Sequence, residues 1–179
     1  MSNLEKIKDI AESRIREGGF GAFSFREIAK EIGIKSASVH YHFPTKTDLA
    51  VAVAKRYTER FMASLNIDSE AGSSRELLEN YIKQFRQAAI YDKKMCLCGA
   101  LAAECGELPE AVHKEARLFF QQNIEWLTAI FLREFSEPST AEKKAVSFLA
   151  TLEGALLVSQ VTGEKTYFEK AVSGIAEQL

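Results

Sequence analysis

The chain has 179 residues, of which 46% are hydrophobic and 27% charged, and its formal net charge is -2 at pH 7. This composition is typical of a folded globular protein, and it excludes a disordered chain, a collagen-like repeat and a small disulfide-stapled protein. Because the chain has only three prolines and ten glycines, and few β-branched runs, it favours long helices over a many-stranded sheet.

The charge is divided unevenly along the chain. Residues 1–60 carry 11 Lys and Arg against 8 Asp and Glu, whereas residues 61–179 carry 12 against 17. A basic first third joined to an acidic body indicates that only the first third meets nucleic acid or another polyanion.

The sequence predicts neither a membrane-spanning segment nor a signal peptide. No apolar run approaches the roughly 18 uninterrupted residues that cross a bilayer. The first residues, MSNLEKIKDI, lack the hydrophobic core of a signal peptide. We therefore expect a cytoplasmic protein with no membrane partner.

Apolar periodicity and helix-start signals predict an all-α protein with nine helices and no strand. Ser24, Ser73 and Thr166 each precede a glutamate by three residues, which is the capping-box pattern, and Thr45 with Asp48 is close to it. The expected helices lie near residues 2–17, 24–32, 36–42, 45–64, 74–91, 96–105, 109–135, 140–162 and 166–179.

Residues 24–43 predict a helix-turn-helix. One apolar stripe runs along the first helix from Phe25 to Ile32. Gly33 can end that helix in the left-handed conformation, and Ser36 can begin a second short helix after a tight turn. The same spacing also fits a plain helical hairpin within a bundle.

The second of these helices has one face that suits the major groove of DNA. Val39 and Phe43 can anchor the helix to the stripe, which leaves a small, polar and aromatic face outward. That face comprises Lys35, Ser36, Ala37, His40 and Tyr41. Beyond Pro44, the residues Thr45 and Lys46 open the next helix, where backbone N–H groups and an ammonium could hold a phosphate.

The order of residues here closely resembles the DNA-binding segment of the tetracycline-repressor (TetR) family. The run is FSFREIAKEIGIKSASVHYHFPTKTDLAVAV, and SVHYHFPTKTDL is its most specific part. The resemblance implies a homodimeric transcription regulator, usually a repressor, which a small molecule releases from its operator. It also implies a helix-turn-helix DNA-binding domain at residues 1–46, followed by a larger helical ligand-binding and dimerisation domain at residues 47–179.

The resemblance carries over to individual positions of the first domain. It implies phosphate contacts at Tyr41 and Lys46, assisted by Ser24 and Arg26 at the start of the second helix. Positions that read bases fall on Lys35, Ser36, Ala37 and His40. Many family members have tyrosine where this chain has His40, which puts a base contact there in doubt.

The helix expected at 109–135 has two apolar stripes, so other helices should surround it. Asn123 interrupts one stripe between Phe119 and Trp126. It is either a core amide bonded to a neighbouring helix or a group that faces a cavity and orients a ligand. Together with the resemblance, this pattern predicts a site for an apolar or aromatic inducer. The candidate ligand-binding residues are Phe61, Met62, Tyr81, Phe85, Leu101, Phe119, Asn123 and Trp126.

Three cysteines, Cys96, Cys98 and Cys105, gather in one segment. Buried thiols that behave as small hydrophobic groups are the first interpretation, and a sensor of oxidants or electrophiles, which needs an exposed thiolate, is the second. Too few further ligands lie near for a metal site, so we expect no metal and no cofactor.

The two C-terminal helices either cap the core of the monomer or pair with their twofold copies. Given the resemblance, we expect a homodimer through a four-helix bundle. The expected partners are therefore double-stranded DNA, a small-molecule inducer and a second copy of the chain. The alternatives are a small helical-bundle enzyme or a protein-interaction module, but the sequence has no nucleophile elbow and no dinucleotide fingerprint, so no catalytic residue is predicted.

Overall fold

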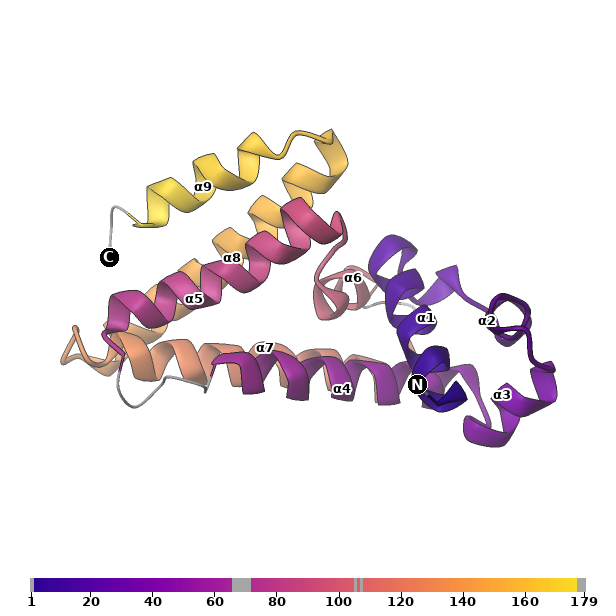
Figure 1. The fold of residues 1–179 in the computed structure, drawn as a ribbon. Coiled ribbons are helices and arrows are strands. Elements are labelled where there is room, and N and C mark those ends of the chain that lie inside the picture. Colours follow the sequence, from indigo (N-terminus) through magenta and orange to yellow (C-terminus); the bar gives the residue numbers. More distant parts are fainter. Residues whose placement is uncertain (1, 66–71, 105, 107, 177–179) are drawn as a thin grey trace. The chain divides into compact units, whose positions relative to one another are not determined.

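A computed structural model describes residues 2–65, 72–104, 106 and 108–176 of the protein. Over these residues the chain is helical without a strand, which confirms the all-α prediction (Figure 1). The α-helices are α1 (Asn3–Gly18), α2 (Phe25–Ile32), α3 (Ser36–His42), α4 (Lys46–Leu65), α5 (Ser74–Arg86), α6 (Leu97–Ala102), α7 (Glu110–Phe131), α8 (Pro138–Thr162) and α9 (Thr166–Ala176). A 3₁₀ turn, η1 (Phe20–Ala22), follows α1, and a π-helical segment, η3 (Gln87–Asp92), follows α5.

The chain forms two compact units. Unit 1 comprises Met1–Glu59 with Leu97–Leu118, and unit 2 comprises Arg60–Cys96 with Phe119–Leu179. Helices α4 and α7 therefore each contribute one part to unit 1 and the other part to unit 2.

In unit 1, helices α1, α2 and α3 pack on one another, and α6 packs on α1. The stripe predicted on α2 is buried at Phe25, Ile28 and Ala29. Arg56 of α4 binds the carboxylates of Glu5, Asp9 and Glu12 on α1 at 2.9, 2.9 and 3.0 Å. Four charged groups on two helices thus fix how α4 lies against the first helix.

The connection from α1 to α2 depends on Gly19. Its φ of 78° and ψ of -168° lie in a region that only glycine readily adopts. Its N–H donates to the carbonyl of Ile15 at 2.8 Å. The next N–H, that of Phe20, donates to Oε1 of Glu104 at 2.8 Å, and a Cβ on Gly19 would lie 1.5 Å from the same oxygen.

We expect Gly19→Ala to destabilise the protein by about 2–3 kcal/mol, because it combines a strained backbone with displacement of Glu104. Gly33→Ala is the matched control, since Gly33 also has a positive φ but has open space around it. That variant should cost only about 1 kcal/mol. Urea unfolding measures the free energy of unfolding of both variants. Equal losses of stability would show that the contact with Glu104 does not add to the cost of Gly19→Ala.

In unit 2, α8 packs against α9, α5 and η3. Ser73 and Glu76 form the capping box expected at the start of α5. Helix α8 begins at Pro138 rather than near 140, because the carboxylate of Glu137 accepts the N–H groups of Ser139 and Thr140 at 3.1 and 2.6 Å. Hydrogen bonds from the hydroxyls of Ser139 and Thr140, together with these two backbone bonds, lower the pKa of Glu137 to about 2.

The prediction of a capping box at the start of α9, formed by Thr166 and Glu169, is wrong. The N–H of Thr166 donates to the carboxylate of Glu164 at 3.2 Å. Glu169 instead accepts two bonds from the guanidinium of Arg86, at 2.7 and 3.0 Å. The Glu169 carboxylate, which the local sequence pattern predicted to cap α9, thus pairs with the distant Arg86 on α5. The expected end of this helix, 177–179, lies outside the described residues.

Helix α8 is the one described helix long and apolar enough to cross a membrane by length and composition, with a mean hydropathy of 1.4 over an 18-residue window. One of its faces is buried in unit 2, from Ala141 through Phe148 and Leu152 to Leu156. It therefore packs as a core helix does. Its other face also carries exposed apolar side chains, at Val146, Leu157, Val158 and Val161.

Candidate functional site

Helix α3 is held on α2 by a short glycine turn. Gly33 is left-handed, with φ 80° and ψ 32°, and its N–H donates to the carbonyls of Ala29 and Lys30. Val39 and Phe43 are buried, at 0% and 7% exposure, and anchor the helix. The two short helices and their turn thus have the geometry of a helix-turn-helix.

The outward face of α3 comprises the side chains that the sequence predicted. Lys35, Ala37, His40 and Tyr41 are exposed, and Ser36 is half-buried. The ring of Tyr41 is 85% exposed, the most of any large hydrophobic side chain in the described residues. A ring so exposed adds little to the core, which favours a role in contact with a partner.

The imidazoles of α3 are placed by neighbouring rings. His40 lies edge-on to Phe25, with ring centroids 4.7 Å apart. His42 is exposed and lies edge-on to Tyr41 at 5.3 Å. His40 therefore contacts α2 through its ring while the residue remains exposed.

The start of α4 differs from an open phosphate cradle. The N–H of Thr45 donates to Asp48 at 2.9 Å, and the N–H of Asp48 donates to the Thr45 hydroxyl at 3.1 Å. Lys46 Nζ lies 4.7 Å from the ring centroids of both Phe20 and Phe23. Burial of this ammonium lowers the pKa of Lys46. Sequence reasoning missed the two rings, because they come from the α1–α2 connection.

The remaining predicted contacts lie at the start of α2. The hydroxyl of Ser24 accepts the N–H of Glu27 at 3.3 Å and donates to its carboxylate at 2.7 Å, so it caps the helix. Arg26 is exposed in the first turn.

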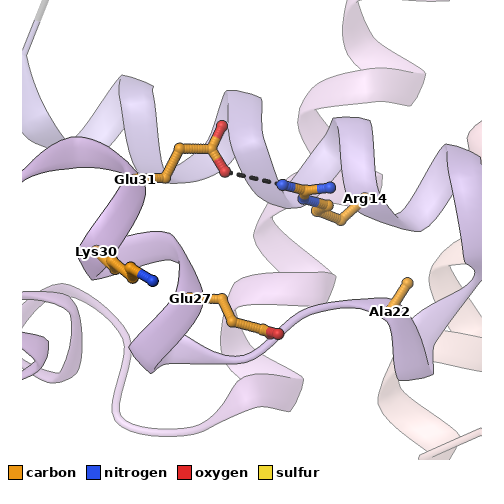
Figure 2. A pocket seen from close by; sticks show the side chains of 5 residues that line it. All are labelled: Arg14, Ala22, Glu27, Lys30 and Glu31. Carbon is orange, nitrogen blue, oxygen red and sulfur yellow. Dashed lines mark hydrogen bonds and ion pairs between the residues drawn. The ribbon is translucent and has the colours of Figure 1, made fainter.

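Unit 1 also has a polar cavity of about 410 Å³, lined by Arg14, Ala22, Glu27, Lys30 and Glu31 (Figure 2). Figure 2 shows Arg14 and Glu31 pointing toward one another, and they form an ion pair of 3.0 Å. Because charged side chains of both signs line it, the cavity does not suit an apolar molecule.

Unit 2 contains a cluster of aromatic side chains centred on Tyr81. The Tyr81 ring stacks on Phe85 at 5.6 Å and on Trp126 at 5.7 Å. It also meets the edges of Phe61 and Phe148, at 5.5 and 5.9 Å. We call these five residues the aromatic cluster. Phe61 and Trp126 are only half-buried, so the cluster reaches the surface of the chain.

Asn123 is completely buried beside this cluster. The hydroxyl of Tyr81 donates to its Oδ1 at 2.6 Å, and its Nδ2 donates to the carbonyl of Phe119 at 2.7 Å. These bonds are those expected of a core amide tied to a neighbouring helix. Burial, with the nearby Glu153 and Cys96, raises the pKa of Tyr81 well above its ordinary value.

Most of the predicted ligand-binding residues lie together in unit 2. Phe61, Tyr81, Phe85 and Trp126 belong to the cluster, and Asn123 bonds to it. Phe119 meets the edge of Phe61 at 5.3 Å. Met62 follows Phe61 on α4 and is half-buried, while Leu101 is buried in α6 of unit 1.

We expect Tyr81→Phe to destabilise the protein by about 1–3 kcal/mol, because it leaves the buried Oδ1 of Asn123 without its donor. Tyr91→Phe is the control, since Tyr91 is 69% exposed, and it should change stability by less than about 0.5 kcal/mol. Chemical denaturation gives both values. An unchanged stability of the Tyr81 variant would mean that Asn123 finds another partner.

Sequence reasoning missed Glu153, a carboxyl group of α8 next to the buried Leu152. The Cys96 side chain is hydrogen-bonded to it, and burial raises the pKa of Glu153 to about 7. Its Oε1 is buried and has no hydrogen-bond partner among the described residues. The signal in the sequence was a single acid within the run LATLEGALLV.

Cys96 and Cys98 are buried, and Cys105 lies outside the described residues. Two buried thiols fit small hydrophobic groups better than an exposed thiolate. The sensor remains a prediction.

Comparison with known proteins adds two family matches. Residues 7–53 match the profile described as bacterial regulatory proteins, tetR family. Residues 72–173 match the profile of the LmrA/YxaF-like transcriptional regulator C-terminal domain. An uncharacterized HTH-type transcriptional regulator of Mycobacterium tuberculosis is 25% identical, with 90% of this chain and 86% of the relative aligned.

Two solved structures are similar over nearly their whole length. A TetR transcriptional regulator from Legionella pneumophila has a TM-score of 0.95 and 32% identity, covering 100% of this chain and 98% of the other. A TetR-family regulator from Agrobacterium tumefaciens has a TM-score of 0.91 and 30% identity, covering 99% and 97%.

Proposed function

The chain belongs to the TetR family of transcriptional regulators, and from this premise we propose that it is a ligand-responsive repressor. In this proposal a cytoplasmic homodimer binds a palindromic operator, and a small apolar or aromatic inducer releases it. Residues 1–46 read the DNA, and residues 47–179 bind the inducer and the second subunit. The chain catalyses no reaction in this role. The exposed face of α3 is the observation that carries the proposal.

We assign the contacts with DNA from exposure and charge. Ala37 is small and exposed, so it permits close approach to base edges, which Lys35, Ser36 and His40 can then reach. Tyr41 offers an exposed hydroxyl to a phosphate oxygen. Ser24, Arg26 and Lys46 complete the phosphate contacts. To bind a phosphate, the Lys46 ammonium must either move away from the rings of Phe20 and Phe23 or contact the phosphate while it stays over them.

The exposed apolar face of α8 supports the homodimer. Leu157, Val158 and Val161 are 51%, 49% and 79% exposed, and Tyr167 of α9 is 43% exposed. Apolar patches of this kind mark interfaces, and α8 and α9 already pack on one another within the chain (Figure 1). A twofold pair of these helices would hold two reading helices about 34–36 Å apart, the spacing of successive major grooves.

The aromatic cluster is the proposed inducer site, because sites for small molecules are mostly apolar and aromatic with a few polar groups. Helix α4 follows α3 in the sequence, and its last turns carry Phe61, which belongs to the proposed site, and Met62 next to it. An inducer that prefers one position of α4 therefore biases the DNA-reading helices. It acts only through its different affinity for the two states.

Selection of random duplexes on the purified protein tests the proposal. We expect enrichment of a palindrome whose half-sites lie about one helical turn apart. The logarithm of the association constant for the selected duplex should fall linearly with the logarithm of the salt concentration, because phosphate contacts release counterions. Failure to enrich any duplex would contradict the proposed function.

A further inference from the structure

The carboxyl group of Glu153 lacks the partners that a buried acid requires. Its Oε1 is closed to solvent and accepts no hydrogen bond from any described residue. Its one described bond comes from the thiol of Cys96, which is a weak donor. Burying a carboxylate is unfavourable unless it is paired and hydrogen-bonded.

No cation of the described chain accompanies this group. The ion pairs of α8 and its neighbours lie elsewhere, as at Arg86 with Glu169. Burial raises the pKa of the Glu153 carboxyl group, and its hydrogen bond with Cys96 lowers it. The charge of Glu153 in turn contributes to the raised pKa of the Tyr81 hydroxyl. The site therefore has a negative group and aromatic walls but no positive charge.

The aromatic cluster supplies the second half of a recognition site. Tyr81 stacks between Phe85 and Trp126 with interplanar angles of 22° and 24°, and the charge of Glu153 acts on its hydroxyl. Rings of this kind attract cations over their faces and stack on other flat rings. Trp126 and Glu153 are both half-buried, so neither residue is completely enclosed by the described chain.

We propose that the inducer is a flat aromatic molecule carrying a protonated nitrogen, which donates to Glu153 Oε1 while its ring joins the aromatic cluster. This inference rests on the proposed function, in which the cluster is the inducer site. A cation gives the carboxylate the counter-charge and the donor that no described residue provides. A neutral ring of the same shape stacks equally well but leaves the buried charge unpaired.

Benzamidine and benzamide test the inference, because they share a ring and nearly the same shape but only benzamidine is charged. Calorimetry is run on the protein without DNA at about pH 8, above the pKa of about 7 of the buried carboxyl group. We expect benzamidine to bind at least ~10-fold more tightly than benzamide. In Glu153→Gln that preference should shrink to within ~2-fold, with benzamide binding unchanged.

Glu142→Gln is the matched control, because Glu142 is an exposed acid of the same helix, and it should keep the full preference. Glu153→Gln should fold at least as well as the parent, since it removes a buried charge; if it does not fold, Glu153→Asp, which keeps the charge, should retain the preference. Equal binding of the two probes to the parent, no binding of benzamidine, or an unchanged preference in Glu153→Gln overturns the inference.

Operator release is measured separately on the selected duplex. If benzamidine binds through Glu153 and lowers operator affinity, both the inference and the inducer role are supported. If it binds through Glu153 and operator affinity does not change, the charge preference is supported and the inducer role of this cluster fails.

Discussion

A glutamate in place of Ala37 should lower the affinity for the operator by at least ~100-fold while leaving the fold intact. Ala37 is exposed at the second position of α3. A larger, negative side chain there would prevent close approach to the base edges and would face the phosphates. Fluorescence anisotropy on the selected duplex at fixed salt measures the affinity. The stability should change by no more than about 0.5 kcal/mol.

Ala111→Glu is the matched control for this variant. Ala111 is also exposed and is also the second residue of its helix, α7. Both variants change the net charge equally, so a general electrostatic effect would lower both affinities alike. We expect the Ala111 variant to bind the operator nearly as well as the parent. Equal affinities of the two variants would show that α3 is not the reading helix.

The double variant Leu157→Glu with Val161→Glu should convert the proposed dimer into a monomer. Both side chains are exposed in the single chain, at 51% and 79%, and the twofold axis would bring four new carboxylates into one interface. Burying charges without partners costs several kcal/mol, so the dimer dissociation constant should rise by at least ~100-fold. Sedimentation velocity at micromolar concentration distinguishes the two states.

Leu132→Glu provides the control for the dimer. Leu132 is 42% exposed and follows α7, outside the face of α8 and α9. Its glutamate should leave the dimer unchanged. A parent chain that sediments as a monomer, or a double variant that remains dimeric, would contradict the proposed interface.

The helix-turn-helix was predictable because its signals are local. A capping serine, an apolar stripe and a glycine that becomes left-handed at φ 80° lie within ten residues of one another. The bounds of α3 agree with the expected 36–42. Each of these features acts through the backbone of its own turn, so no knowledge of distant residues is needed.

Features that depend on distant contacts were not predictable. The helix expected at 74–91 changes at Gln87 into the π-helical segment η3. Gln160 of α8 donates to the carbonyl of Ala89 in that segment at 3.2 Å. The apolar pattern of a π-helical turn resembles that of an α-helix over so few residues.

The candidate site was predicted in composition but not in its polar details. Tyr81 and Asn123 were both expected near a ligand. The 2.6 Å hydrogen bond between them joins residues 42 positions apart in the sequence, on two different helices, so no local signal predicts it. Glu153 was overlooked because one acid in a helix is ordinarily exposed. Lys46 was expected to offer its ammonium to a phosphate, and the sequence did not indicate that its Nζ lies over two rings of the α1–α2 connection.

Hydroxyl-radical footprinting of the selected operator tests whether α3 enters the major groove from two copies of the chain. We expect two protected segments about one helical turn apart on one side of the duplex, both lost with Ala37→Glu. A single protected segment, or two that persist in that variant, would contradict it.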